Sequence, residues 1–97
     1  MREISFEWDE KKNRTNQLKH SVTFEEAVTV FYDENALEFY DFDDSHKEER
    51  LLLLGLSANL KILLICHCYR KNENVIRIIS ARKATNKEQQ EYTGEKK

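Results

Sequence analysis

The sequence predicts one α+β domain, in which a mostly antiparallel, curved sheet packs with two N-terminal helices and a short C-terminal helix. Its 97 residues are the size of a single domain, and they include no proline and two glycines. After an initial strand, helix-forming patterns dominate the first part of the chain, and strand-forming runs separated by short polar turns dominate the second. We assign residues 1–92 to this domain and expect residues 93–97 to form a frayed tail.

The first two elements are a short strand and a helix of unusual composition. Residues 4–8 alternate apolar with polar side chains, which is typical of a strand. Asp9 then suits the N-cap of a helix that runs to about His20. Between those two residues only Leu18 is strongly apolar, so the helix has no apolar stripe to bury. We therefore expect its ends or polar contacts to hold it in place.

A second helix should contribute to the core. Residues 23–26 read Thr-Phe-Glu-Glu, a capping box in which the threonine and the second glutamate satisfy each other's backbone donors. Apolar side chains follow at helical spacing, namely Phe24, Ala27, Val28 and Phe31. Residues 37–40 favour a strand, and residues 41–46 form an acidic loop.

The second half predicts three strands joined by hairpins and followed by a helix. We expect the strands at residues 50–57, 61–69 and 75–83, with turns at residues 58–59 and 71–74. Residues 85–88, Thr-Asn-Lys-Glu, form a second capping box and begin a terminal helix. That helix carries little apolar surface beyond Tyr92, so we expect it to pack lightly or to fray.

Charge is distributed unevenly along the chain, although the net charge is only −2. Residues 1–50 contain 7 Lys or Arg and 14 Asp or Glu, a balance of −7, whereas residues 51–97 contain 9 and 4, a balance of +5. The second half is therefore the candidate for contact with nucleic acid. The acidic first half suits a basic segment of a protein partner.

The sequence disfavours a membrane protein and a metal site. The longest apolar runs, at residues 51–54 and 62–66, are far shorter than the roughly 18 residues of a membrane span. The N-terminus lacks the pattern of a signal peptide, so we expect a cytoplasmic protein. Residues 66–68 read Cys-His-Cys, but neighbours in a strand face opposite ways and cannot converge on one zinc ion. We expect buried thiols at Cys66 and Cys68, with no metal and no cofactor.

Two blocks of residues resemble the BrnT family of toxins. The first block comprises Phe6-Glu-Trp-Asp9, Lys12, Asn16, Lys19-His20 and residues 22–27. The second comprises Arg50 before an apolar strand that ends at Gly55, and Ile76-Arg-Ile-Ile-Ser-Ala-Arg82 followed by Ala84-Thr85. The similarity covers almost the whole chain. Two features depart from the family pattern: Ser21 stands where glycine is usual, and the last helix lacks the arginines common there.

This resemblance implies a RelE/ParE-like fold and a toxin of a type II toxin-antitoxin system. It implies an endoribonuclease that cleaves messenger RNA and so inhibits translation. It also implies a small BrnA-like antitoxin of the ribbon-helix-helix type that neutralises the toxin. Operator DNA would be bound only through the complex of the two proteins.

Cleavage of RNA without a metal ion requires a base, an acid and positive charge beside the reacting phosphate. Arginine suits the last role because its planar guanidinium grips phosphate oxygens in pairs and stays charged. Arg50 and Arg82, which match family positions, are catalytic candidates. His67 is the third, because imidazoles exchange protons near neutral pH; a structural role in its strand is the alternative.

Strand alternation determines which of these side chains can share a face. In a regular last strand Arg82 has the parity of Ile78, and Arg77 has the opposite parity. Only one of the two arginines can then line the site, and we favour Arg82. A hairpin with its tip at residues 72–73 pairs His67 with Ile78, which places His67 on the same face as Arg82.

Other side chains are candidates for RNA binding. On the first helix, Lys12, Asn16 and Lys19 lie at helical spacing with His20 beside them, and this row either contacts RNA or is a solvated face. Tyr69 and Arg70 resemble a pair for base stacking and phosphate binding, although Tyr69 also suits an ordinary strand. The RNA-binding candidates are Lys12, Lys19, His20, Tyr69, Arg70 and Arg77.

Two functions remain open at this point. The first is a metal-independent endoribonuclease toxin, which the basic strands with His67 and Arg82 favour. The second is a non-enzymatic toxin or binding module that acts through protein contact, as ParE-type toxins act on DNA gyrase. The acidic total charge and the final helix without arginines favour the second. The fold does not distinguish them.

Overall fold

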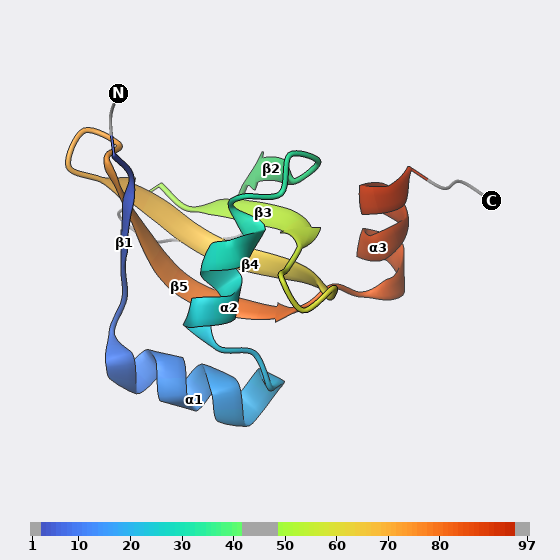
Figure 1. Cartoon of the computed structure of the whole chain (residues 1–97), viewed down its shortest axis with the longest axis horizontal. Helices are drawn as coiled ribbons and strands as arrows, with labels where there is room; N and C mark the ends of the chain where they lie inside the picture. The colour runs from blue at the N-terminus through green and yellow to red at the C-terminus, as the bar shows by residue number, and fades with distance from the viewer. Residues whose placement is uncertain (1–2, 42–48, 95–97) are drawn as a thin grey trace.

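A five-stranded mixed sheet, in the order β1-β5-β4-β3-β2, forms the centre of the computed structural model, which describes residues 3–41 and 49–94. Its strands, drawn in Figure 1, are β1 (Ser5–Glu7), β2 (Leu37–Tyr40), β3 (Leu51–Leu56), β4 (Ile62–Arg70) and β5 (Val75–Lys83). β1 runs parallel to β5, and the other neighbouring pairs are antiparallel. The predicted α+β fold with a mostly antiparallel sheet is confirmed. Of the predicted acidic loop, residues 42–46 lie outside the described part of the chain.

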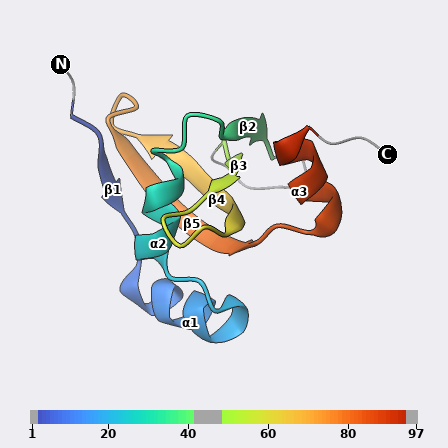
Figure 2. The same cartoon turned by 45° about the vertical axis from the view of Figure 1, so that its right-hand side comes forward.

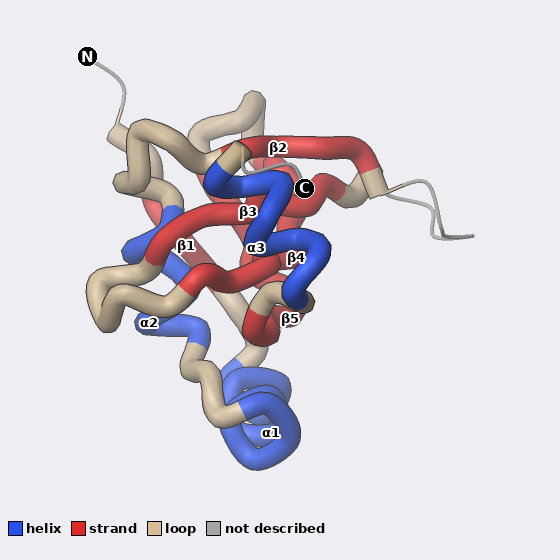
Figure 3. The backbone as a smooth tube through the Cα atoms, turned by 90° about the vertical axis from the view of Figure 1, so that its right-hand side faces the viewer, coloured by secondary structure: helices blue, strands red, loops and turns tan. Residues whose placement is uncertain are grey.

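The three predicted helices are α1 (Glu10–His20), α2 (Phe24–Val30) and α3 (Asn86–Thr93). α2 lies across one face of the sheet, and α1 follows the margin formed by β5 (Figure 1 and Figure 2). α3 contacts β3, and Figure 3 shows it in front of β3 and β4. In the described residues, no helix combines the length and apolarity needed to cross a membrane.

The two faces of the sheet have different surroundings. The face packed against α2, here called the helix face, carries most of the buried apolar side chains: Leu53, Leu63, Ile65, Ile76, Ile78 and Ala81. The other face, here called the open face, carries Leu52, Leu54, Leu64 and Cys66. α3 covers only part of the open face, where Tyr92 packs against Leu54 and Leu64.

Two buried asparagines attach α1 to the rest of the molecule in place of an apolar stripe. Asn16 donates to the carbonyl oxygens of Val22 and Ala81, both at 2.8 Å, and accepts from the Ala81 N–H at 3.1 Å. Its amide therefore continues the hydrogen bonding of β5 beyond the end of β1. Asn13 accepts from the Phe24 N–H at 2.8 Å, which secures the start of α2. The predicted polar attachment of α1 is confirmed.

Backbone conformation explains two small residues near the helices. Ser21 ends α1 with a left-handed φ of 58°, a conformation that favours glycine. Gly55 of β3 permits close packing against α2. A Cβ atom there would lie 2.8 Å from Cγ1 of Val30 and 2.9 Å from Cβ of Ala36, so a larger residue would push α2 off the sheet.

A β-bulge in the pairing of β4 with β5 changes which side chains share a face. Cys66 pairs with Ser80 but His67 pairs with Ile78, which leaves Ile79 as the extra residue. The predicted pairing of His67 with Ile78 is correct. The predicted shared face of His67 and Arg82 is wrong, because it assumed a regular strand. Beyond the bulge Arg82 pairs with Leu64 and lies on the open face.

The C-terminal helix is attached by its ends and by one aromatic side chain. Thr85 and Glu88 form the predicted capping box, and Gly94 ends the helix with a φ of 75°. The Tyr92 hydroxyl donates to Asp33 at 2.6 Å, and this bond to the carboxylate raises the pKa of Tyr92 to about 12. α3 has no buried residue of its own, so the prediction that it packs lightly agrees with the structure.

Candidate active site

A hollow of about 490 Å³ lies in the open face between the end of α1 and the end of β5. Its floor is apolar and consists of Leu52, Leu64 and Cys66. Four basic side chains surround this floor and come from three separate segments: Lys19 and His20 from the end of α1, Arg50 from the start of β3, and Arg82 from β5. Asp41 and Ser80 complete the rim.

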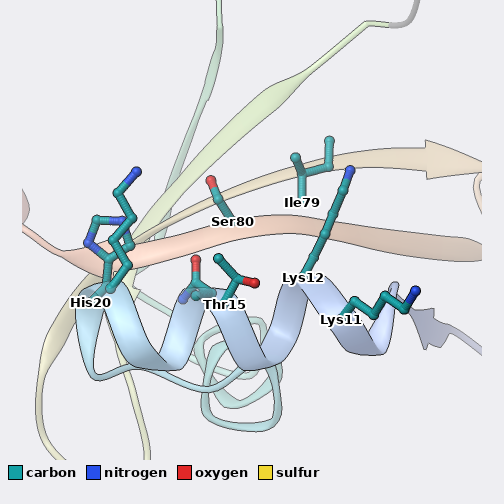
Figure 4. A pocket seen from close by; sticks show the side chains of 8 residues that line it. Lys11, Lys12, Thr15, His20, Ile79 and Ser80 are labelled. Atoms are coloured by element: carbon teal, nitrogen blue, oxygen red, sulfur yellow. The ribbon is translucent and has the colours of Figure 1, made fainter.

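A second groove, of about 300 Å³, extends this hollow along α1. The two cavities share Lys19, His20, Ile79 and Ser80. Figure 4 shows Lys12 and His20 projecting from α1 toward the side on which Ile79 and Ser80 lie. Lys11 and Thr15 also line the groove. The polar row predicted on this helix therefore borders a groove. Asn16 also lines it, although its amide serves the attachment of the helix.

The β-bulge forms the junction between the two cavities. Ile79, its extra residue, lines both cavities, as does Ser80 next to it. Without the extra residue the alternation of β5 would turn Arg82 to the buried helix face. Bulges of this kind commonly redirect a side chain next to an active site.

A carboxylate from α3 holds Arg82 in place. Glu88 accepts from Nη1 of Arg82 at 2.9 Å and from Nη2 at 3.0 Å, a bidentate pair. Nη1 also donates to the Lys83 carbonyl oxygen at 3.1 Å. The bond to Glu88 raises the pKa of Arg82, and the bond to Arg82 lowers the pKa of Glu88. Both groups are therefore charged at neutral pH.

Arg50 approaches the hollow from the far side of the open face. It directly precedes β3, and its carbonyl oxygen accepts from the Asp41 N–H at 2.9 Å, which extends the pairing of β2 with β3 by one step. This backbone bond brings Asp41 and Arg50 to the same rim. Among the described residues, the hollow is lined by one acidic side chain, Asp41, and four basic ones.

His67 lies on the helix face, away from the hollow. Its side chain is fully buried, with its ring edge-on to Phe31 at 4.9 Å and to Tyr69 at 5.6 Å between ring centres. Nε2 lies 3.0 Å from a carboxylate oxygen of Glu38. A carboxylate only accepts hydrogen bonds, so Nε2 carries the proton. Burial lowers the pKa of His67, and the bond to Glu38 opposes part of that shift.

The remaining predicted RNA-binding residues do not line the hollow. The Tyr69 hydroxyl donates to Glu38 at 2.8 Å, and burial together with this carboxylate raises the pKa of Tyr69 to about 12. Arg77 contacts the Glu7 carboxylate at 3.0 Å and Arg70 contacts it at 3.5 Å. Arg77 shares the open face with Arg82, contrary to expectation, but lies toward the opposite end of β5.

The structure thus brings together five of the nine predicted side chains, namely Lys12, Lys19, His20, Arg50 and Arg82. Sequence reasoning missed Glu88 as a site residue, because its capping-box pattern already explained its presence. It also missed Ser80, which no motif singled out. Among the described residues, no group of three His, Cys, Asp or Glu is placed to hold a metal ion.

The chemistry of the hollow suits a phosphodiester. Its guanidinium groups can bind phosphate oxygens, and His20 supplies an imidazole that can accept a proton at the same rim.

Comparison with known proteins agrees with this chemistry. A family model described as "Ribonuclease toxin, BrnT, of type II toxin-antitoxin system" matches residues 8–88. The chain is also similar to the crystal structure of the Brucella abortus ribonuclease toxin BrnT, with a TM-score of 0.65 and 24% sequence identity over 86% of this chain and 99% of that chain. This likeness shows a shared fold. No match was found among curated proteins.

Proposed function

Because the chain belongs to the BrnT family of ribonuclease toxins of type II toxin-antitoxin systems, we propose that it is an endoribonuclease that cleaves messenger RNA and thereby inhibits translation in the cytoplasm. One observation carries this proposal: Lys19, His20, Arg50 and Arg82 converge on one hollow of the open face. They come from three segments that are far apart in the sequence, and no charge or motif requires these segments to meet in the fold.

The proposed reaction uses the RNA's own ribose as the nucleophile and requires no metal ion. Arg50 and Arg82 hold the reacting phosphate and stabilise the negative charge that develops on its oxygens. His20 takes the proton of the adjacent 2′-OH, whose oxygen attacks phosphorus. The bond from phosphorus to the 5′ oxygen breaks, and that oxygen takes a proton from water. The products carry a 2′,3′-cyclic phosphate and a 5′-hydroxyl.

The groove along α1 gives the RNA a path beyond the reacting phosphate. Lys12 and Lys19 lie along it, and Lys19 borders both cavities. Lysine binds phosphate as a point charge without selecting a base. We therefore assign Lys12 and Lys19 to neighbouring phosphates. Arg70 and Arg77 receive no role in this scheme, because neither of them lines the hollow or the groove.

Membership of a type II family implies an antitoxin partner. We propose that this partner is a BrnA-like ribbon-helix-helix protein, and that operator DNA is contacted only through the complex. The acidic first half, with its balance of −7, suits a basic antitoxin segment. Reversing the charges of Asp41, Asp43 and Asp44 should weaken the complex; unchanged affinity would remove this part of the acidic half from the interface. Asp43 and Asp44 lie outside the described residues.

Induced expression tests the proposed function. Cells expressing the wild type should stop growing and accumulate broken messages, and Arg82→Ala should relieve both effects. Arg14→Ala is the matched control, because Arg14 is exposed on α1 and borders neither cavity. Circular dichroism of the purified variants should show that each one folds. In vitro, replacing the ribose at the cleaved position with deoxyribose should abolish cleavage.

Growth arrest with intact messages would contradict the proposal. It would favour instead the toxin that acts by protein contact, as the ParE type acts on gyrase. Loss of Arg82 should cost roughly 100- to 1,000-fold in cleavage rate, the usual cost of removing one donor that stabilises a developing oxyanion.

A further inference from the structure

We propose that Glu88 of α3 is a positioning residue for Arg82, which makes the C-terminal helix part of the cleavage machinery although it contributes no arginine. This inference rests on the proposed function, since it concerns the phosphate that Arg82 would bind. It assigns a role to an acidic side chain at a site that must attract an anion.

The hydrogen bonds of Arg82 determine which edge of its guanidinium can reach the RNA. The group has five N–H donors. Glu88 takes one from each Nη atom, and the Lys83 carbonyl takes the second from Nη1. With three of the five N–H donors of Arg82 occupied, the Nε donor and one Nη2 donor remain. These two lie along the same edge of the group, so they can bind two phosphate oxygens as a pair.

Glu88 is itself held in place by the start of α3. Its Oε1 atom accepts from the Thr85 N–H at 2.8 Å as well as from Nη1 of Arg82. Its own N–H donates to the Thr85 hydroxyl at 3.2 Å. The capping box therefore sets the carboxylate at a defined position beyond the end of β5, and Arg82 is fixed between this carboxylate and its own strand.

The other end of α3 is attached beside the end of β3. The Tyr92 hydroxyl donates to Asp33 at 2.6 Å, and the same Asp33 oxygen accepts from the Leu56 N–H at 2.8 Å. A short helix held at both ends cannot easily rotate. The position of Glu88 is thus determined by the fold and not by the mobility of a single side chain.

Electrostatics predicts a distinctive kinetic result. The Glu88 carboxylate offsets the charge of Arg82, so it weakens ground-state attraction for RNA. Its benefit must then be orientation, which is worth most in the transition state. Removing the carboxylate should therefore lower kcat. KM should stay the same or fall, because ground-state binding of RNA is no longer weakened. A carboxylate that merely masks the site would give a higher kcat when removed.

Three substitutions, two on α3 and one at its N-cap, separate these effects. Glu88→Gln retains the helix cap, because glutamine also serves in a capping box, but its amide nitrogen cannot accept from Nη2. Glu91→Gln makes the same charge change on the same helix, but the hydrogen bonds of Arg82 go to Glu88 and to the Lys83 carbonyl oxygen and not to Glu91. Thr85→Ala weakens the helix cap without removing the carboxylate. Comparing the three distinguishes orientation of Arg82 from net charge and from helix stability.

The experiment measures kcat and KM for cleavage of a synthetic RNA oligonucleotide by the full chain. We expect Glu88→Gln to lower kcat by about tenfold and Glu91→Gln to stay within about twofold of wild type. Thr85→Ala keeps the carboxylate and the Thr85 N–H that donates to it, so its loss of kcat should be smaller than that of Glu88→Gln. Nitrogen-15 NMR of the arginine side chains should show separate, slowly exchanging Nη signals for Arg82 that merge in Glu88→Gln. This signature reports on the ion pair itself.

Three results would overturn the inference. An unchanged or higher kcat in Glu88→Gln would show that the ion pair does not serve catalysis. An equal loss in Thr85→Ala would reduce Glu88 to a helix cap. Merged Nη signals in the wild type would show that the ion pair does not hold Arg82. A wild type that leaves RNA intact would instead reject the proposed function, and this inference with it.

Discussion

The two faces of the sheet use the same kinds of side chain in opposite ways. On the helix face, His67 is fully buried, and its ring nitrogens face a carboxylate at the edge of the core and the Ile65 carbonyl oxygen. At the open face, His20 borders a hollow beside Arg50 and Arg82. An imidazole enclosed by aromatic rings contributes to stability, whereas one at the rim of a cationic hollow can reach a substrate. Position relative to the sheet, and not residue type, separates the two roles.

Replacing each of the two histidines in turn is the sharpest test of this comparison. We expect His20→Gln to lower the rate of RNA cleavage by about 100-fold, the lower range for loss of a general base. His67→Gln should lower the melting temperature and leave the cleavage rate of the folded protein close to wild type. Cleavage assays at a temperature where both variants are folded measure the difference. The opposite pattern would return the catalytic role to His67.

The attachment of α1 tests whether buried polar contacts can replace an apolar stripe. Asn16→Ala should lower the free energy of unfolding by about 3 kcal/mol, because it leaves the Ala81 N–H and two carbonyl oxygens buried without their present partner. Urea denaturation measures this change. The exposed neighbour supplies the control, since Gln17→Ala should change the free energy by less than about 0.5 kcal/mol. Equal effects would mean that the asparagine bonds contribute little.

The pH dependence of the free energy of unfolding should reflect the burial of His67 on the helix face. Burial lowers the pKa of His67 from its ordinary value of 6.5, so the unfolded chain binds a proton at a higher pH than the native one. Its contribution to stability is present above pH 6.5 and is lost as the pH falls toward the lowered pKa. The limiting slope for one proton is about 1.4 kcal/mol per pH unit. Denaturation at several pH values should show a smaller loss in His67→Gln; equal slopes would contradict this account.

The smallest effect should come from the groove along α1. Lys12→Ala should weaken binding of a non-cleavable RNA analogue a few-fold and lower the slope of log affinity against log salt by about 0.7, the value for one phosphate of a single strand. Lys61→Ala, in the turn between β3 and β4, should leave the slope unchanged. Binding titrations at several salt concentrations measure both. An unchanged slope in Lys12→Ala would place the RNA outside this groove.

Local chemistry made much of the fold predictable from the sequence. Asp9, Thr23 and Thr85 were recognised as N-caps, because a side-chain oxygen that accepts a backbone N–H is a property of a few consecutive residues. Of the capping box predicted at residues 23–26 only the threonine half forms, because the Glu26 carboxylate accepts from the Ser57 hydroxyl instead. The hairpin register that pairs His67 with Ile78 also followed from a short turn. The composition of one helix is likewise a local property, and the absence of an apolar stripe in α1 correctly predicted that polar contacts hold it.

The composition of the candidate site was only partly predictable. The sequence by itself determined the elements, their order, and the basic residues available for binding phosphate. The tertiary structure alone decided that one extra residue, Ile79, turns Arg82 away from His67 and toward Lys19, His20 and Arg50. The contact between Glu88 and Arg82 also depends on the tertiary structure. A bulge depends on how two strands and a helix fit together, so no local pattern in β5 predicts it. A single inserted residue then moves every later side chain of the strand to the other face.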